Sequence, residues 1–331
     1  NLRHRLPLYI HFRYLIINFL VSTVTWIASG AETQTIEFIF YALVCTGCRQ
    51  NHNSCFWNRV NILAAPNLKR MFTSGNLKVG HSVFEFNSPG LGQIIGNAGV
   101  EFVFLDMEHS GFGFSETKQA IAGLRLGGVA ALVRPPSDAY HHIARALDIG
   151  ADGLVMPMVG TKEEAEHIVS CMKYPPKGKR GVALGIAHDW YASGNPADVL
   201  AAANRRTALA TLIETEEGIA NIDKIASVKD VDCLWIGHFD LSCSLGINGQ
   251  FEHPDFIKAC DKVKRAANKH GKALARLAGS PADCIALYKK GYNVLCYSGD
   301  LWVYQQALND GVNKIRASCK PRKSTKGTKK K

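Results

Sequence analysis

The sequence predicts an α/β fold, a closed (β/α)8 or TIM barrel, and two observations carry that prediction. From Lys78 onward, short β-branched or apolar runs alternate with amphipathic segments of about 10 to 15 residues, the pattern of consecutive βα units and a parallel sheet. Eight such units fit between Lys78 and Arg316, and a span of about 240 residues matches the size of a closed barrel.

The expected elements alternate along this span. The strand-like segments, which are apolar and often β-branched, are residues 78–84, 102–106, 129–134, 153–156, 208–214, 233–236, 272–277 and 294–298. The helix candidates between them, with apolar residues at helical spacing, are residues 91–98, 115–126, 139–147, 161–172, 216–226, 255–270, 281–290 and 301–316.

One long interruption, residues 173–206, separates the fourth unit from the fifth. It contains Tyr174-Pro175-Pro176 and a glycine-rich turn through Gly178, Gly181 and Gly185. A loop of this length inside a compact domain usually has a function. We therefore expect it to overhang the site.

The formal net charge of +11 is concentrated at the ends of the chain of 331 residues. Residues 1–66 hold five Arg against two Glu, and residues 320–331 hold seven Lys or Arg and no acid, which leaves +1 for residues 67–319. This nearly neutral middle argues against nucleic acid as a partner, because such binding needs a basic surface. With 47% hydrophobic residues, the chain can bury a full core.

Three regions are expected. In the N-terminal extension, residues 1–63, Arg3 and Arg5 precede an apolar run at 15–27 and small residues at 28–30, as in a secretory signal. A second apolar stretch at 36–45, unconnected to the later pattern, favours a non-native or mis-assigned segment instead. Residues 64–318 form the barrel, and residues 319–331 form a solvated basic tail.

The ten cysteines show no framework of a secreted disulfide protein. Those beyond residue 66 lie mostly in apolar segments, which predicts reduced, buried thiols in a cytoplasmic protein whose core domain has no membrane partner. Cys45, Cys48, His52 and Cys55 resemble a metal knuckle, but the short loops between them and the lack of a second cluster disfavour a metal there.

Polar side chains follow several of the expected strands. In a barrel, residues just past the carboxyl ends of the strands converge on one pocket. Here they are Asp106, Glu108 and His109 after the second strand, Arg134 after the third, Glu214 after the fifth, and Asp240 after the sixth. Such a set is hard to explain by packing alone, so we expect a catalytic site.

Glu214 and Asp240 are candidate metal ligands. Their hard carboxylate oxygens suit Mg²⁺ first, with Mn²⁺, Co²⁺ or Zn²⁺ as alternatives, and two protein ligands leave positions open for water and substrate. Either residue alone would more often pair with a Lys or cap a helix. Their joint placement at adjacent strand ends favours the metal.

Arg134 offers a planar, permanent charge for a carboxylate or an enolate oxygen, against the alternative of a plain ion pair. His109 can act as a general base near neutral pH, with Asp106 or another carboxylate orienting its ring, although a lone His is more often structural. Glu108 points the other way if the strand geometry persists, so no chemical role is assigned to it.

These residues carry a resemblance. The sequence resembles the HpcH/HpaI aldolase and citrate lyase family over about residues 67–316, above all its class II pyruvate aldolases, the 4-hydroxy-2-oxoheptanedioate and 2-dehydro-3-deoxyglucarate aldolases. The matching motifs are Leu105-Asp106-Met107-Glu108-His109, Val133-Arg134-Pro135, Val155-Met156-Pro157-Met158-Val159, Tyr174-Pro175-Pro176 with Arg180-Gly181-Val182, Ile213-Glu214-Thr215, and Ile236-Gly237 through Asp240-Leu241-Ser242.

The resemblance implies a barrel of the type that binds pyruvate or phosphoenolpyruvate, and a role for each matching residue. Glu214 and Asp240 bind the metal, His109 is the base and Arg134 stabilises the enolate. Gly237, Phe239 and Asp240 bind the substrate. The residue that raises the basicity of the His falls on Asp148, which precedes the fourth strand and can serve only across a subunit contact, so Asp106 remains the local candidate.

The implied reaction is aldol cleavage or formation of 4-hydroxy-2-oxo acids through a pyruvate enolate, with pyruvate or oxaloacetate plus an aldehyde as substrates and a hexamer or another dimer-based homo-oligomer as the assembly. Two departures from the family pattern put the aldehyde partner in question more than the metal, although the first also removes a polar contact to the metal shell. Leu212 stands where many members have Gln, and His238 and Phe239 replace a Pro and a small residue.

Three alternatives stay open. Oxaloacetate decarboxylation or a macrophomate synthase-like reaction would use the same enolate. Gly90, Gly92 and Gly96, followed by a strand that ends in Asp106, imitate a dinucleotide-binding fingerprint and would make the chain an oxidoreductase. The third alternative, a non-catalytic homologue, is disfavoured by the complete set of His109, Arg134, Glu214 and Asp240.

Overall fold

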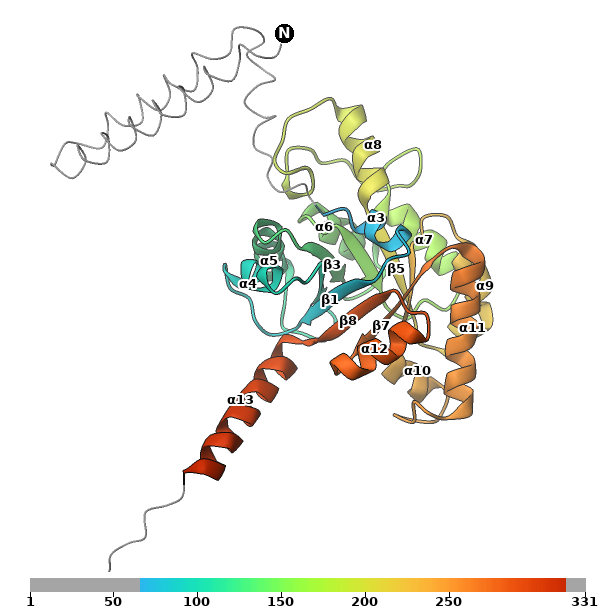
Figure 1. The fold of residues 1–331 in the computed structure, drawn as a ribbon. Coiled ribbons are helices and arrows are strands. Elements are labelled where there is room, and N and C mark those ends of the chain that lie inside the picture. Colours follow the sequence, from blue (N-terminus) through green and yellow to red (C-terminus); the bar gives the residue numbers. More distant parts are fainter. Residues whose placement is uncertain (1–65, 320–331) are drawn as a thin grey trace, which may run out of the picture. The chain divides into compact units, whose positions relative to one another are not determined.

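The computed structural model describes residues 66–319. The predicted N-terminal extension, with its signal-like run and its motif from Cys45 to Cys55, lies outside the described residues, as does nearly all of the basic tail. The described part forms a closed barrel of parallel strands in the order β1 to β8, and β8 pairs with β1 (Figure 1). The predicted (β/α)8 barrel is confirmed.

The strands begin and end close to the predicted positions. They are β1 (Lys78–Val83), β2 (Phe102–Asp106), β3 (Ala130–Arg134), β4 (Gly153–Met156), β5 (Ala208–Ile213), β6 (Cys233–Ile236), β7 (Ala273–Ala278) and β8 (Val294–Gly299). The helices are α3 (Leu68–Thr73), α4 (Leu91–Asn97), α5 (Phe114–Leu126), α6 (Tyr140–Asp148), α7 (Lys162–Met172), η1 (Ala187–Asp189), α8 (Pro196–Arg206), α9 (Glu216–Ser227), α10 (His238–Ser244), α11 (Pro254–His270), α12 (Pro281–Lys289) and α13 (Asp300–Ser318).

The barrel interior is packed with apolar side chains from alternate strand positions. Phe102 and Phe104 of β2, Leu132 of β3 and Trp235 of β6 belong to one buried cluster. The rings of Phe104 and Trp235 lie 5.5 Å apart. The short helix α3 closes the amino-terminal end of the barrel, where Phe72 packs edge-on against Phe102 at 6.5 Å. Within residues 66–319, the barrel interior is therefore filled by side chains and has no open channel below the site.

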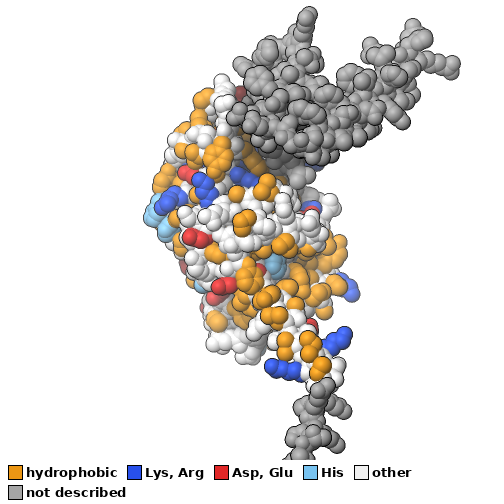
Figure 2. Space-filling model, turned by 90° about the vertical axis from the view of Figure 1, so that its left-hand side faces the viewer, with side chains coloured by type: hydrophobic (Ala, Val, Ile, Leu, Met, Phe, Trp, Pro, Cys, Tyr) orange, Lys and Arg blue, Asp and Glu red, His pale blue; other side chains and the backbone are white. Residues whose placement is uncertain are grey.

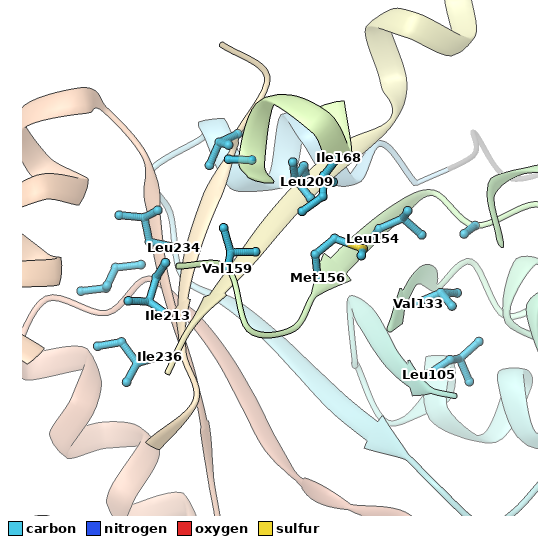
Figure 3. Close-up of a cluster of buried hydrophobic side chains, with 14 of the residues drawn as sticks. Leu105, Val133, Leu154, Met156, Val159, Ile168, Leu209, Ile213, Leu234 and Ile236 are labelled. Carbon is cyan, nitrogen blue, oxygen red and sulfur yellow. The ribbon is translucent and has the colours of Figure 1, made fainter. Parts of the chain in front are cut away.

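A second apolar layer lies between the strands and the surrounding helices. Val103 and Leu105, the other alternate positions of β2, belong to this layer together with Ile213 and Ile236. Figure 3 shows part of it, with side chains from β2 to β6 and with Ile168 of α7 beside Leu209 of β5. Because inward and outward positions alternate, Asp106, which follows Leu105, faces the barrel interior.

Four glycines let helices α4 and α5 touch. A Cβ on Gly92 would lie 2.0 Å from the carbonyl oxygen of Gly123, and a Cβ on Gly96 would lie 2.2 Å from that of Gly127. These glycines are needed for close helix contact. The dinucleotide-binding alternative, which rested on this glycine pattern, loses its basis.

Residues 173–206 connect the end of α7 to the start of β5. They lie at the amino-terminal end of the barrel, where Arg180 pairs with Asp148 and stacks on Tyr174 at 4.5 Å. The buried Lys173 ammonium donates to the carbonyl oxygen of Thr207 at 2.9 Å in the same region. The expectation that this loop overhangs the site of its own barrel is wrong, because a loop that precedes a strand lies at the end opposite the pocket.

The last helix, α13, leaves the barrel instead of packing along β8 and β1 (Figure 1). Its exposed large apolar side chains are Trp302, Val303, Tyr304, Leu308, Val312 and Ile315. Figure 2 shows hydrophobic side chains next to basic ones at the end of this helix. Within residues 66–319, no helix is long and apolar enough to span a membrane.

The cysteines of the described part are free. Cys171, Cys233 and Cys296 are buried, as expected, but Cys243 and Cys319 are exposed. The expectation of buried thiols therefore holds only in part.

Candidate active site

A buried ion pair joins the ends of β2 and β3. Asp106 pairs with Arg134 in the strand register, and both continue the inward positions of their strands. Arg134 Nε donates to Asp106 Oδ1 at 2.9 Å, and its Nη2 donates to Oδ2. Burial alone would lower the pKa of Arg134, but the hydrogen bonds and the negative charge of Asp106 outweigh the effect of burial. The pKa of Arg134 is therefore raised, and the guanidinium stays charged.

Asp106 also orders the turn after β2. Its Oδ1 accepts the backbone N–H of Glu108 at 2.8 Å and that of His109 at 3.3 Å. The structure therefore brings Asp106 to the backbone of His109 and to Arg134, with no hydrogen bond to the imidazole among the described contacts. Asp106 positions Arg134 and the turn that carries His109.

Glu108 is a residue that sequence reasoning missed. Its Oε2 lies 3.0 Å from Arg134 Nη1 and 3.7 Å from His109 Nε2. Glu108 would point away from the pocket if the strand continued past Asp106, but β2 ends there, and the following turn directs Glu108 toward Arg134. Glu108 is thus the carboxylate next to the imidazole, whose side chain is 63% exposed.

Glu214 is the buried carboxylate at the end of β5. Burial raises its pKa to about 7, the nearby Asp240 adds to this, and the charge of Arg134 opposes it. Asp240, Arg134 and Glu108 all act on the Glu214 carboxyl, so these four groups share one site. The predicted convergence of polar residues from β2, β3, β5 and β6 is present.

Two backbone features hold the Glu214 side chain in place. The backbone N–H of Met158, which has a left-handed φ of 57°, donates to Glu214 Oε1 at 2.7 Å. A Cβ on Gly237 would lie 2.1 Å from Glu214 Oε2, so this position requires glycine. The sequence singled out Gly237 for substrate binding but gave no signal for its contact with Glu214.

Asp240 lies in the first turn of α10 and is exposed. Within residues 66–319, no group of three or more His, Cys, Asp and Glu side chains is arranged to hold a metal ion. Glu214 and Asp240 still fit a divalent ion, because a cation between them would relieve the burial and mutual repulsion that raise the pKa of Glu214. Two carboxylates leave most ligand positions for water and substrate.

The residues that depart from the family pattern make the edge of the site apolar. Leu212 faces the barrel interior two positions before Glu214 and has no polar atom to offer. His238 packs against Phe251 at 5.1 Å, and burial together with the charge of Arg276 lowers its pKa to about 4, so the ring is neutral. Phe239 is 60% exposed, with its ring 4.6 Å from that of His238.

Asp148 lies where barrel geometry predicted, at the far end from this site. It is the last residue of α6, it precedes β4, and Arg180 Nη2 donates to its Oδ1. The structure therefore does not bring Asp148 to His109 of the same chain.

The fold and the site together define a (β/α)8 barrel with a guanidinium and several carboxylates gathered at the carboxyl ends of its strands. A sequence model of the family described as HpcH/HpaI aldolase/citrate lyase matches residues 85–304. The chain belongs to the HpcH/HpaI aldolase/citrate lyase family. It is an aldolase, a carbon–carbon lyase.

Individual relatives agree with this assignment. A 5-keto-4-deoxy-D-glucarate aldolase from Shigella boydii serotype 18 is 35% identical over 215 residues, which are 65% of this chain and 83% of the relative. The crystal structure of an HpcH/HpaI aldolase from Desulfitobacterium hafniense DCB-2 has a TM-score of 0.71 at 32% identity, covering 75% of this chain and 95% of the other. Macrophomate synthase has a TM-score of 0.68 at 28% identity, covering 76% and 90%.

Proposed function

We propose that this chain is a divalent-metal-dependent aldolase that cleaves or forms 4-hydroxy-2-oxo acids through the enolate of pyruvate. The observation that carries the proposal is the Glu214 carboxyl, buried beside Asp240 without a contacting Lys or Arg among the described ion pairs. A buried carboxyl with a raised pKa in a cleft is a functional-site candidate. The relatives named as aldolases support the same chemistry.

Arg134 is suited to hold the enolate oxygen. Asp106 accepts the Nε–H and one N–H of Nη2, and Glu108 pairs with Nη1. About two of the five guanidinium N–H groups therefore remain for substrate. Because both carboxylates fix the planar fork, the guanidinium needs no reorganisation when negative charge develops. When bound by Glu214 and Asp240, a divalent ion supplies Lewis-acid activation of the keto acid.

His109 is proposed as the base for the aldol hydroxyl. The Glu108 Oε2 atom lies 3.7 Å from His109 Nε2 and can orient the ring. During cleavage the hydroxyl proton passes to the imidazole, the bond between C3 and C4 breaks, and the electron pair remains on the pyruvate part as the enolate. Reprotonation of the enolate carbon then gives pyruvate.

The test is a screen of 4-hydroxy-2-oxo acids for release of pyruvate, with and without EDTA. We expect cleavage that is lost in EDTA and restored by Mg²⁺ or Mn²⁺. Pyruvate methyl-proton exchange in D₂O, followed by NMR without any aldehyde, tests enolate formation separately. Absence of exchange in the metal-loaded enzyme would contradict the proposal.

Oxaloacetate decarboxylation is the second candidate, and the likeness to macrophomate synthase is the observation that favours it. Loss of CO₂ leaves the same enolate and needs no base at the hydroxyl. We therefore expect His109→Ala to slow aldol cleavage by about 10² to 10⁴ and to affect decarboxylation much less. Equal loss of both activities, with metal affinity and fold unchanged, would remove the base role of His109.

We also propose that α13 packs on a second copy of the chain, within a dimer-based assembly. The exposed side chains of α13 include Leu308, Val312 and Ile315. In a closed barrel an eighth helix would cover the outer face of β1 and β8, but here His81 and Tyr297 on these strands are only half-buried. A helix from a second copy would cover this face. In such an assembly Asp148 would act at the site of a neighbouring subunit. The test is the double variant Leu308→Glu with Val312→Glu, whose mass measured by light scattering should fall to that of a monomer.

A further inference from the structure

The mouth of the barrel has an apolar side as well as a charged one. The charged groups follow β2, β3, β5 and β6, whereas aromatic rings follow β8 and β1. Phe84 directly follows β1, and Trp302 lies in the first turn of α13, with ring centroids 5.2 Å apart. The next pair outward is Phe86 and Tyr304, edge-on at 5.4 Å. We call these four side chains the aromatic wall.

Asp300 holds the two halves of the aromatic wall together. Its side chain is buried, and its carboxylate oxygens accept the backbone N–H groups of Phe84 at 3.1 Å, Glu85 at 3.0 Å and Phe86 at 2.7 Å. Three such bonds to one carboxylate fix the segment after β1 against the start of α13. The rings are therefore presented as one preformed surface.

The aromatic wall is continuous with the catalytic groups. The Arg134 guanidinium carbon lies 5.1 Å from the centroid of the Phe104 ring. The Phe104 ring lies 6.3 Å from that of Phe84, which contacts Trp302. A substrate part bound beyond the enolate, on the side of β8 and β1, therefore meets Phe84 and Trp302.

Arg276 of β7, whose charge acts on His238, packs on the rings of Phe251 and Phe256, and the segments that follow the strands on this side of the mouth add no further Lys or Arg. The residues that follow β6, β7, β8 and β1, at 237–239, 279–280, 299–304 and 84–88, contain no Lys or Arg. They do contain Glu85, whose side chain is exposed. A second carboxylate on the acceptor would find no Lys or Arg in these segments to neutralise it.

We propose that Phe84 and Trp302, positioned by Asp300, form the acceptor side of the site and select aldehydes with an apolar, preferably aromatic, substituent over aldehydes with a carboxylate. The enolate carbon of pyruvate attacks the aldehyde carbon, and the carbonyl π pair becomes an alkoxide. The alkoxide takes up the proton that was removed from the pyruvate methyl group, so no other reactant is needed. This inference rests on the proposed function of the site.

The experiment compares aldol addition of pyruvate to benzaldehyde and to succinic semialdehyde, as the ratio of their kcat/KM values. We expect the enzyme to prefer benzaldehyde, and Trp302→Ala to lower the ratio about tenfold, which corresponds to about 1.4 kcal/mol. Trp302→Phe should restore most of the ratio. Asp300→Asn should raise KM for benzaldehyde more than it lowers kcat, because it loosens the wall and leaves the enolate groups in place.

Tyr288→Ala is the matched control, since Tyr288 is an exposed tyrosine on α12 and belongs to neither wall nor site. It should leave the ratio and the methyl-proton exchange at wild-type values. A preference of the wild type for succinic semialdehyde, or an equal loss for both aldehydes in Trp302→Ala, would overturn the inference while exchange persists. Loss of exchange in the wild type would instead overturn the proposed function, and the acceptor assignment with it.

Discussion

Asp232 at the amino-terminal end of the barrel and Glu214 at the carboxyl-terminal end are both buried carboxylates, but they differ in their partners. At the amino-terminal end, Lys69 lies 2.8 Å from Asp230 and 3.0 Å from Asp232. At the carboxyl-terminal end, Glu214 receives one backbone N–H, and burial raises its pKa to about 7. Charges that stabilise a fold have partners within the chain, whereas a buried carboxyl without a cation is costly unless a ligand completes it.

The largest expected effect comes from Glu214→Gln. If this carboxylate binds the catalytic ion, aldol cleavage should fall by at least about 10³, because metal activation contributes several kcal/mol to the transition state. The same change should stabilise the metal-free protein at pH 8. The folded-state pKa of Glu214 is raised, so stability is lost as pH rises from about 4.5 to about 7, and neutral Gln avoids that loss.

The measurement is a pair of urea unfolding curves at pH 8 in EDTA, with steady-state rates in Mg²⁺. We expect the free energy of unfolding to rise by about 1 to 3 kcal/mol in the variant. A variant that is inactive and also less stable would indicate that Glu214 supports the fold, and the contrast between the two ends would fail.

Arg134→Lys is expected to have the next largest effect. A Lys can neutralise Asp106 but cannot keep both the bidentate bond and a free N–H for the enolate oxygen. Methyl-proton exchange and aldol cleavage should both fall by about 10² to 10³, measured by NMR and by pyruvate release. If cleavage falls and exchange does not, Arg134 acts after the enolate has formed.

Metal binding should depend on pH. Because the pKa of Glu214 is about 7 without metal, the ion must displace a proton below that pH. The affinity for Mn²⁺, measured by calorimetry, should fall up to about tenfold from pH 7 to pH 6 and change little from pH 7.5 to pH 8.5. An equal affinity at pH 6 and pH 8 would mean that Glu214 does not bind the ion.

The smallest expected effect lies at the amino-terminal end. Asp230→Asn removes one partner of the half-buried Lys69 and should lower the free energy of unfolding by about 1 kcal/mol. Activity should stay at the wild-type value, because the residue precedes β6 and lies far from the pocket. A loss of activity without a loss of stability would contradict the division of roles.

The sequence predicted the barrel well because its signals are local. The runs at 102–106, 153–156 and 233–236 became strands with those bounds, since each is a short, nearly continuous apolar run, as expected of a strand buried on both faces. The candidates Asp106, Arg134 and Glu214 could be found in the same way, because each continues the inward positions of its strand.

What the sequence could not predict depends on where strands end and on the backbone of distant loops. Glu108 reaches Arg134 only because β2 stops at Asp106, and Met158 donates its backbone N–H to Glu214 from a left-handed conformation at Met158 itself. The direction of α13 could not be predicted, because a pattern of apolar residues predicts a helix but not the surface on which it packs. The side of the barrel on which 173–206 lies could have been predicted, because every loop that precedes a strand lies at the amino-terminal end.

The bonds of Asp300 have a consequence for regulation. Asp300 is the first residue of α13, the helix that we propose to pack on a second copy, and its carboxylate also fixes the segment that carries Phe84. If packing of α13 alters the aromatic wall, binding of the acceptor aldehyde and association of the subunits are coupled. Linkage then requires that each process change the equilibrium constant of the other by the same factor. An aldehyde that tightens the wall would then strengthen the assembly, and dilution of the enzyme would weaken its hold on that aldehyde.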